Sequence, residues 1–540
     1  MKKTILSVLL ISSSFCYSQQ WSWAKKANNT TAAQVAKKIT CSDSDHVYVI
    51  GSNKGQATFG STQLDTGSFV VKYTSAGSVL WAAHLDGDVV DVRTDPGGAV
   101  YLLANFTGAV TVGGNLFNSA AQAFYLAKYT GGGSFVWVKE LGSLAAAQAN
   151  SLDVNAQSNI YVTGYYTDSL TLGSQTLRDS SSRCSTNFFL ARFNSSGAIT
   201  WATDGPANSS AATDNYCTGT CVRITKAGLP VVIGQSNDWG GGANIFVLKY
   251  SSSGNMLQNQ VGTGGEWGQW GETEFALDDS SNLFHIWNAD THYGYYPRMI
   301  KHDTLLNSQW TQDVGGQGMY PGYELDHTPA TDAQGNVYLV GELIAIYGDS
   351  LQVCNQWLKT KGGADVLVGK LDRNGNCSWF LSAGGPNDEG ADHIYYPPLN
   401  NLSICVDKHG GCYIAGLYNI STGSGRYTDT MSFGSNSLIN DGTWEQIFVA
   451  KLSENTTTAV KNYTASNFSI YPNPSAGAFT VQGPAAGCDI KVTSLLGEVL
   501  YKGHSSKPYF RVDMGGPAPG VYLVEINTGT ARVVKKVMIE

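Results

Sequence analysis

Two short patterns of hydrophobic and polar positions alternate through most of the chain. One has the form Phe-Val-Ala-Lys-Tyr and occurs seven times, at residues 69–73, 125–129, 189–193, 246–250, 298–302, 367–371 and 448–452. The other has the form Val-Tyr-Val-x-Gly and precedes each of these, starting at residues 47, 100, 160, 230, 283, 337 and 412. Short β-branched and aromatic runs bounded by turn residues predict β-strands. The recurring pair of strands therefore indicates a repeat architecture.

A third strand of the repeat is marked by a tryptophan and follows most of the lysine strands after a short turn. Its tryptophans are Trp81, Trp137, Trp201, Trp310 and Trp379, and Leu257 fills this place in the fourth repeat. The seventh lysine strand has no such strand after it, whereas an unpaired copy, Trp21-Ser-Trp23, stands before the first repeat. We expect this N-terminal strand to complete the last repeat, because a closed ring removes the exposed edges of an open array.

These repeats predict an all-β fold in which residues 19–453 form a seven-bladed β-propeller. Six blades, or a division into two domains, is the alternative. Recurrent Asp-x-x-Gly segments, such as Asp95-Pro-Gly-Gly98, lie between two strands of the repeat. They lack the alternating carboxylates of a calcium loop and supply the Asp and Gly that a tight turn requires, so we interpret them as turns.

The end of the chain has a pattern of its own. Four pairs of apolar positions, Phe479/Val481, Ile490/Val492, Phe510/Val512 and Val521/Leu523, alternate with more polar neighbours. They predict the strands of a small immunoglobulin-like β-sandwich over residues 467–540. Residues 454–466, rich in Thr, Asn and Ser, are interpreted as the linker. Pro472 and Pro474 cannot donate ladder hydrogen bonds, so they mark the start of an edge strand.

Four features of this segment resemble the type A C-terminal sorting domain of the type IX secretion system, the outer-membrane export route of Bacteroidetes-type bacteria. They are Tyr471-Pro472-Asn473-Pro474 followed by Gly477 and Phe479, then Leu496-Gly497, then Gly520-Val-Tyr522-Leu-Val524, and finally Lys535-Lys536. The resemblance implies that the secretion machinery recognises these residues. It also implies that the domain is usually removed and that the cargo can be attached to a surface glycolipid. The propeller repeats are similar to bacterial repeats often found ahead of this domain.

The beginning of the chain also predicts export. Met1-Lys-Lys3 precedes an apolar run over residues 5–11 and small residues before Gln19, the layout of a secretory signal peptide over residues 1–18. Phe15 is too large for a lipidation signal at Cys16. No other stretch approaches the roughly 18 consecutive apolar residues of a membrane helix. We therefore expect no membrane insertion and a secreted or cell-surface protein after cleavage and outer-membrane export.

The net charge and the cysteines limit which binding partners, disulfides and metal sites the chain is expected to have. The chain has 34 basic and 42 acidic residues, a net charge of −8, which argues against nucleic acid as a partner. Cys405 and Cys412 are expected to pair across a hairpin, and Cys217–Cys221 and Cys354–Cys377 are weaker candidate disulfides. Paired Cys-x-x-Cys units are missing from the sequence, so we expect no structural zinc, and no cofactor is predicted.

Departures from the repeat indicate where a ligand binds, since a repeat scaffold carries function in its loops. In blades 5–7 the connections that leave one face become long and aromatic. Exposed tryptophan and tyrosine beside carboxylates and amides suit a glycan or a polypeptide. The alternative is that these rings only pack the loops onto one another. The predicted ligand-binding residues are Trp267, Trp270, Tyr293, Tyr295, Tyr296, Tyr320, Tyr323, Tyr395 and Tyr396.

An enzyme is the second hypothesis. Asp326-His327 and Asp392-His393 hold similar places before successive blades, and with Glu266, Glu272 and Glu324 they could serve a secreted hydrolase or lyase. The sequence contains no catalytic motif of the nucleophile-elbow, HExxH or phosphate-loop type, so we expect no catalytic residues. A passive surface-layer or spacer protein is the third hypothesis.

Overall fold

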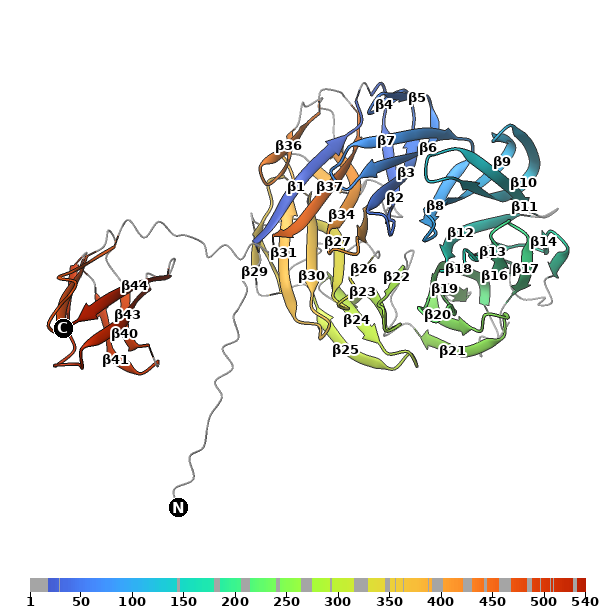
Figure 1. Ribbon diagram of the computed structural model, residues 1–540. Coiled ribbons are helices and arrows are strands. Elements are labelled where there is room, and N and C mark those ends of the chain that lie inside the picture. The colour runs from blue at the N-terminus through green and yellow to red at the C-terminus, as the bar shows by residue number, and fades with distance from the viewer. Residues whose placement is uncertain are drawn as a thin grey trace, which may run out of the picture. The chain divides into compact units, whose positions relative to one another are not determined.

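The computed structural model describes most of the chain, in two compact units that are treated separately here (Figure 1). The first is Gln19–Asn455, and the second lies within Thr456–Glu540. No helix among the described residues is long and apolar enough to cross a membrane. The described residues are 18–28, 30–142, 146–178, 185–204, 214–238, 243–263, 274–291, 294–314, 329–344, 350–354, 356–362, 364–386, 388–390, 402–420, 430–440, 444–455, 468–482, 488–495, 497–505, 507, 509–527 and 532–540.

The first unit contains seven large antiparallel sheets among its described residues, in the order of the seven repeats. We number them as blades 1 to 7 and name their strands inner, second, third and outer. The inner strands are β2 (Gln34–Cys41), β8 (Asp88–Thr94), β12 (Ala147–Val154), β18 (Asp214–Ile224), β22 (Phe275–Leu277), β26 (Ala330–Thr331) and β33 (Ser403–Val406), with β32 (Asp388–Gly390) on the same edge of blade 7. The second strands are β3 (His46–Asn53), β9 (Val100–Val112), β13 (Ile160–Tyr166), β19 (Pro230–Asp238), β23 (Leu283–Thr291), β27 (Val337–Ile344) and β34 (Cys412–Ile420).

The two remaining strands of each blade lie further from the centre of the ring seen in Figure 1. The third strands are β6 (Gly67–Thr74), β10 (Asn115–Tyr129), β16 (Asn187–Phe193), β20 (Ala243–Tyr250), β24 (Gly294–His302), β30 (Ala364–Leu371) and β37 (Gln446–Asn455). The outer strands are β7 (Val79–Leu85), β11 (Phe135–Leu141), β17 (Ile199–Thr203), β21 (Met256–Thr263), β25 (Ser308–Asp313), β31 (Cys377–Ala383) and, for blade 7, β1 (Ser18–Lys26).

The predicted closure of the ring by the N-terminal strand is confirmed. β1 pairs with β37, which makes it the outer strand of blade 7. A hydrogen bond of 2.9 Å joins Ser22 Oγ to Ser453 Oγ. The inner strands contact one another in order around the ring, including β33 with β2. A disulfide between Cys41 and Cys405 joins those last two strands across 364 residues of sequence.

The disulfides correct part of the sequence prediction. Cys405 pairs with Cys41 and not with Cys412. Tyr413 is opposite Cys405 in the β33–β34 ladder, so the side chain of Cys412 points to the other face of the sheet. The predicted Cys217–Cys221 pair is also wrong, because Cys221 is a buried free thiol. The third prediction is confirmed, since Cys354 and Cys377 form a disulfide.

At most junctions the lysine and tryptophan of the repeat link one blade to the next. In blade 1, Lys72 Nζ lies 5.3 Å from the ring centre of Tyr48, and donates to the carbonyl of Gly131 in blade 2 at 2.7 Å. Trp81 Nε1 donates to the same carbonyl at 3.1 Å. The other tryptophans that reach a carbonyl of the next blade in this way are Trp23, Trp137, Trp201 and Trp310. One assignment was wrong by a residue: Gln258, and not Leu257, pairs with Lys249 at the tryptophan position of blade 4.

The Asp-x-x-Gly segments are turns, as predicted. Asp95 Oδ1 accepts from the Ala99 backbone N–H at 2.9 Å, and its Oδ2 accepts from the Tyr101 hydroxyl at 3.0 Å. Asp332 and Asp407 repeat both contacts in blades 6 and 7. Gly98 has a φ of 80°, the left-handed conformation that favours glycine. The carboxylates are therefore bound by their own turns and by the adjacent strand.

The second unit has two sheets around one core. The three-stranded sheet contains β38 (Ser469–Tyr471), β39 (Ala478–Gln482) and β42 (Tyr509–Asp513). The four-stranded sheet contains β41 (Val499–Ser505), β40 (Cys488–Ser494), β43 (Gly520–Asn527) and β44 (Arg532–Ile539). Phe479 and Val481 of the first sheet pack with Ile490, Val524 and Val537 of the second. The predicted alternation of apolar positions thus produces a two-sheet core, and the immunoglobulin-like topology stays a prediction.

Candidate functional site

The connections between strands leave the propeller on two opposite faces, because each sheet is an antiparallel meander. Turns from inner to second strand, and from third to outer strand, lie on one face, which we call the turn face. Connections from second to third strand, and from an outer strand to the next inner strand, lie on the other, which we call the loop face. The segments 264–273 and 315–328, which contain Trp267, Trp270, Tyr320 and Tyr323, each connect an outer strand to the next inner strand and so start and end at the loop face. The segment 391–401 instead lies between β32 and β33, which pair with neighbouring parts of β34 on the inner edge of blade 7.

Most of the predicted ligand-binding residues lie outside the described part of the chain. These are Trp267, Trp270, Tyr293, Tyr320, Tyr323, Tyr395 and Tyr396. Tyr295 and Tyr296 begin the third strand of blade 5, where their backbones pair with Asp290 and Ala289, and their side chains also lie outside the description. The same holds for the residues of the enzyme hypothesis, Glu266, Glu272, Glu324, Asp326, His327, Asp392 and His393. Both sets stay predictions.

A cluster of buried charges lies among the inner strands, and the sequence analysis missed it. We call it the axial cluster. Blades 1 to 4 supply most of its members, and Glu274 directly precedes the inner strand of blade 5. The exposed fraction of its side chains ranges from 0% to 19%. It joins the cations Lys38, Arg93 and Arg223 with the carboxylates Asp91, Asp153 and Glu274.

Lys38 connects blade 1 with two other blades. Its Nζ lies 2.5 Å from Glu274 Oε1 and 3.6 Å from Asp91 Oδ2. Arg223 Nη2 donates to Glu274 Oε2 at 3.2 Å, which adds blade 4 to the same group. Asp91 Oδ2 also accepts from Ser151 Oγ at 3.1 Å. The charges of blades 1 to 5 therefore form one network across the inner strands.

Opposite charges keep most of this network ionised. Burial opposes the charge of Lys38, but Asp91 and Glu274 outweigh it and raise the pKa of the ammonium. Burial also opposes the Glu274 carboxylate, but Lys38 and Arg223 hold its pKa below the ordinary value. Arg93 and Lys38 lower the pKa of Asp91 in the same way against its burial. For Asp153, burial dominates and raises the pKa. These shifts move the pKa values of Lys38, Asp91 and Glu274 away from neutral pH, so the three groups stay charged and hold the inner strands together. General acid–base catalysis, by contrast, needs a pKa near the working pH.

The repeat did contain a signal for the axial cluster. The inner strands of blades 1 to 4 each have a register irregularity at the same place. The residues directly after it are Lys38, Asp91, Ser151 and Cys221, and the residues two further along are Thr40, Arg93, Asp153 and Arg223. Alignment of the inner strands would have brought these polar positions into register. Among the described residues, no group of three His, Cys, Asp or Glu side chains is arranged to hold a metal ion.

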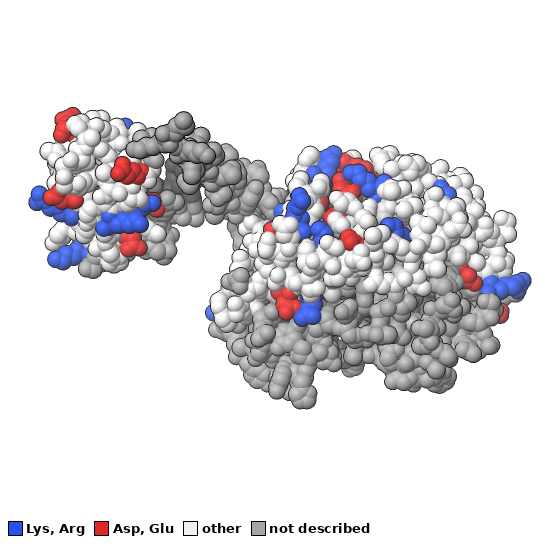
Figure 2. Space-filling model, turned by 90° about the horizontal axis from the view of Figure 1, so that it is seen from below, with Lys and Arg blue, Asp and Glu red and all other residues white. Residues whose placement is uncertain are grey.

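The face of the propeller seen in Figure 2 is sparsely charged where its residues are described. Only 14% of the residues of the chain are Asp, Glu, Lys or Arg. Figure 2 shows mostly uncharged atoms between scattered charged side chains. On the described part of this face, no extended patch of one sign is seen that would attract a polyanion.

In the second unit, the sorting motif is tied to the final strand. Asn473 Nδ2 donates to the carbonyl of Lys536 at 2.9 Å, and Asn473 Oδ1 accepts from the backbone N–H of Met538 at 2.8 Å. Ser475 continues this contact, because its N–H donates to the carbonyl of Met538 at 2.9 Å. The first and last motifs of the domain therefore form one structural element.

The other sorting residues have local roles or are exposed. Gly477 has a φ of 99° and lies against Pro517, where a side chain would not fit. Tyr522 lies two residues after Gly520 in the sorting motif. Its hydroxyl donates to the carbonyl of Ala518 at 2.7 Å. Tyr471 is 48% exposed, and Lys536 is exposed on β44 beside the half-buried Lys535. This leaves an aromatic ring and a lysine accessible at the junction of the two motifs.

The C-terminal unit matches a known family. Residues 469–540 fit the model of the secretion system C-terminal sorting domain. This match confirms the predicted sorting domain. It marks the chain for export to the cell surface, or for secretion, through the type IX system of Bacteroidetes.

Similarities of the remainder are distant. An alignment of 203 positions, which covers 31% of this chain and 14% of the relative, is 25% identical to the uncharacterised WD repeat-containing protein L264 of Acanthamoeba polyphaga mimivirus. PorZ, an essential surface component of the type IX secretion system of Porphyromonas gingivalis, is 13% identical with a TM-score of 0.28, over 93% of this chain and 70% of PorZ. A Trypanosoma rangeli sialidase mutant is 9% identical with a TM-score of 0.33, over 86% of this chain and 85% of the sialidase. These values say nothing about activity or ligand.

Proposed function

We propose that this chain is an exported binding protein whose propeller recognises a glycan or a protein through the loop face of blades 5–7. The sorting domain delivers it to the outside of the cell through the type IX secretion machinery. In this proposal the second unit supplies the address, and the first unit supplies the recognition.

The difference between the two faces of the propeller carries the proposal. On the turn face the connections are tight hairpins, such as those that end at Gly98 and Gly133, and they bond within themselves. On the loop face, residues 86–87 are enough to lead from β7 to β8, whereas residues 264–274 lead from β21 to β22 and 314–329 from β25 to β26. A repeat scaffold that lengthens its connections on one face does so where the loops carry function.

The composition of the long connections favours binding. They contain Trp267, Trp270, Tyr320 and Tyr323, rings that combine a broad apolar surface with a hydrogen-bonding group. Such rings suit the C–H face of a sugar or the side chains of a polypeptide. The hydrolase or lyase alternative would use Asp326, His327, Asp392 and His393 on the same face.

A glycan and protein array tests the proposal. The mature chain, residues 19–540, is compared with a variant that carries Trp267→Ala, Trp270→Ala, Tyr323→Ala and Tyr396→Ala. We expect the parent to bind and the variant to lose binding while its circular dichroism and thermal unfolding are unchanged. The matched control is Trp357→Ala, which removes a tryptophan that is 67% exposed on blade 6 and should bind like the parent.

Two results would contradict the proposal. Equal binding by parent and variant would exclude the predicted aromatic residues, and no binding by the parent would favour the spacer hypothesis. Cleavage of an arrayed glycan that is lost in Asp326→Ala or Asp392→Ala would favour the enzyme alternative instead.

A further inference from the structure

Five blades carry an additional hairpin between their second and third strands, which we call the perimeter hairpin. In blade 2 it is the extension of β9 and β10 over residues 108–119. In blades 4 and 5 the second and third strands are joined only by residues 239–242 and 292–293, which are too few for such a hairpin. The other four are β4 (Ala57–Phe59) with β5 (Thr62–Leu64), β14 (Ser169–Leu172) with β15 (Gln175–Arg178), β28 (Ser350–Val353) with β29 (Gln356–Lys359), and β35 (Thr430–Phe433) with β36 (Asn436–Ile439).

The tip of each perimeter hairpin touches the outer strand of its own blade, at the first residue of that strand in blades 1, 2, 3 and 6 and at Trp21 of β1 in blade 7. A side chain on the tip residues Gly60, Gly173 or Gly434 would meet Val79, Ile199 or Trp21, respectively. Gly113 stands in the same way against Phe135 in blade 2. In blade 6 the contact is covalent, because the tip residue Cys354 forms its disulfide with Cys377.

Each perimeter hairpin also reaches the outer strand of the preceding blade. Thr58 bridges Asn28 after β1, Thr171 bridges Gly142 after β11, and Ser432 bridges Gly384 after β31. In blade 6, Cys354 N–H donates to the carbonyl of Val314 after β25 at 2.8 Å. In blade 2, Thr111 N–H donates to Asp86 after β7 at 2.7 Å. The hairpin therefore fills the perimeter groove between two successive outer strands.

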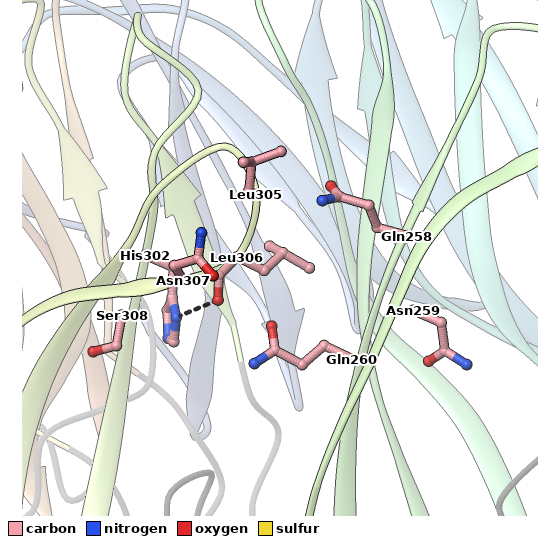
Figure 3. A pocket seen from close by; sticks show the side chains of 8 residues that line it. All are labelled: Gln258, Asn259, Gln260, His302, Leu305, Leu306, Asn307 and Ser308. Atoms are coloured by element: carbon pink, nitrogen blue, oxygen red, sulfur yellow. Dashed lines mark hydrogen bonds between the residues drawn. The ribbon is translucent and has the colours of Figure 1, made fainter.

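The groove between the outer strands of blades 4 and 5 has no perimeter hairpin of its own. A cavity of about 510 Å³ lies there, bounded on one side by β21 and on the other by the third-to-outer turn of blade 5 (Figure 3). Gln258, Asn259 and Gln260 line it from β21. His302, Leu305, Leu306, Asn307 and Ser308 line it from blade 5.

Several described junctions between blades have a tryptophan position on one blade and a glycine on the next. The junction at this groove departs from that pattern. Gln258 replaces the tryptophan, and Leu306, with a φ of 64°, replaces the glycine on which the tryptophan packs in other blades. Gln258 Oε1 is buried and has no hydrogen-bond donor among the residues that the structure describes. Leu305 is 66% exposed and Met256, the first residue of β21, is 44% exposed. A buried acceptor without a donor and exposed apolar side chains both cost stability unless something covers them.

We propose that this groove binds an extended strand or hairpin of a partner polypeptide, which takes the place of the perimeter hairpin missing from blade 5. An apolar side chain of the partner packs on Leu305, and a backbone N–H donates to Gln258 Oε1. β21 is the last strand of its sheet, so its free edge can extend the pairing as in strand addition. The residues that line this site come from β21 and the third-to-outer turn of blade 5, and none of them belongs to the aromatic set of the proposed function.

The hairpins within the chain favour a polypeptide over a sugar. Side-chain amides already bind backbone groups between hairpins and outer strands: Asn436 Nδ2 donates to the carbonyl of Trp21 at 2.9 Å, and Gln356 Oε1 accepts from the Phe380 N–H at 3.0 Å. Gln258, Gln260 and Asn307 can act in the same way. The lining contains no tryptophan or tyrosine on which a sugar ring would stack.

Disulfide exchange tests the site and its geometry together. Ser308 is exposed and holds the place in blade 5 that Cys377 holds in blade 6. The probe is the peptide of residues 350–359, with its cysteine activated as a mixed disulfide with thionitrobenzoate. We expect the Ser308→Cys variant of the mature chain to release thionitrobenzoate at least about tenfold faster than Ser253→Cys, an exposed position on the turn face, after correction for the reactivity of each thiol with free reagent and for the parent chain.

A second substitution locates the contact. Leu305→Glu in the Ser308→Cys background should reduce the rate to the control level, whereas Leu116→Glu, at a position 71% exposed on the hairpin of blade 2, should not. Equal rates for Ser308→Cys and Ser253→Cys, or for the peptide and a scrambled version, would overturn the proposal. Protection of the introduced thiol of the Ser308→Cys variant by neutral oligosaccharides, without any preference for the peptide, would also overturn it, in favour of a sugar site.

Discussion

The junction between blades 7 and 1 and the junction between blades 4 and 5 derive from the same repeat but are held in different ways. Where the ring closes, β1 pairs with β37, the Cys41–Cys405 disulfide joins the inner strands, and Trp23 packs on Gly77. Between blades 4 and 5, Gln258 and Leu306 replace that tryptophan and glycine, and blade 5 supplies no perimeter hairpin to cover the groove. The chain is reinforced where the backbone is interrupted, and its surface is left open where the backbone itself holds two blades together.

Removal of the first strand should have the largest effect on this comparison. Trp21 and Trp23 are 6% and 8% exposed, and loss of a buried tryptophan typically costs about 3–5 kcal/mol. Loss of both approaches the whole stability of a typical domain, about 5–15 kcal/mol. We expect a chain that begins at Asn28 to show no cooperative thermal transition by circular dichroism. Cooperative unfolding at the parental temperature would show that closure by β1 is dispensable.

The axial cluster should be the next most sensitive element, because it ties blade 1 to blade 5 across the ring. Lys38→Met leaves Asp91 and Glu274 buried without their ammonium partner, and such a loss typically costs about 3–5 kcal/mol. Denaturant unfolding measures this change. Adding Glu274→Gln to Lys38→Met should recover part of the loss, and a double variant less stable than Lys38→Met would contradict the assigned contact.

Acid should weaken the same link. The pKa values of Asp91 and Glu274 are lowered in the folded chain, so their contribution is fully present above the ordinary values of 3.8 and 4.5 and is lost as the pH falls through the lowered values. Asp153, with a raised pKa, acts with the opposite sign and makes the decline shallower. Urea unfolding across acidic pH should show a weaker dependence for Glu274→Gln than for the parent. An equal dependence in the two chains would exclude Glu274 as a source of it.

The two disulfides allow a direct comparison of covalent links. Replacing Cys41 and Cys405 with serine opens a loop of 364 residues, whereas replacing Cys354 and Cys377 opens one of 23. Removal of a native disulfide typically costs about 2–5 kcal/mol, and chain entropy favours the larger cost for the longer loop. Thermal unfolding should therefore fall further for the Cys41/Cys405 variant. A larger fall in thermal stability for the Cys354/Cys377 variant would show that the stronger disulfide is not the one that closes the ring.

The smallest effect is expected at the open junction. Gln258→Leu removes a buried acceptor that has no donor in the described part of the chain, and should raise the free energy of unfolding by about 1 kcal/mol. Gln260→Leu, from the same strand, is the matched control and should change it less. A clear loss of stability in Gln258→Leu would mean that the amide has a partner within the chain.

Strands and turns that recur from repeat to repeat could be predicted from the sequence. Contacts between residues of different repeats were missed. Trp23 indicated closure because it copies an element found in other blades, and the turns followed from Asp and Gly at fixed offsets. Leu257 was wrong by one residue although the spacing was regular: the partner lies nine residues after the lysine in Lys72/Trp81 and in Lys249/Gln258 alike, and only the missing tryptophan hid the position. Cys41 was missed as the partner of Cys405, because their contact depends on the ring bringing the first and last inner strands together.

The candidate site divides in the same way. The axial cluster was missed because its residues are far apart in sequence and meet only at the axis. The sorting residues were recognised because their spacing is local, and the structure adds that Asn473 joins both ends of that domain. The aromatic residues of blades 5–7 stay predictions, since long connections have no repeat to fix their conformation.

Closure by the first strand also sets an order in time. β1 leaves the ribosome before the other strands of the propeller, yet its pairing partner, β37, lies more than 400 residues later, so the ring cannot be completed until nearly the whole propeller has been made. The sorting domain comes after that last strand in the sequence. A chain cut short within the propeller would lack both its final blade and its export address. A chain that carries the sorting domain has therefore already been synthesised through the whole propeller.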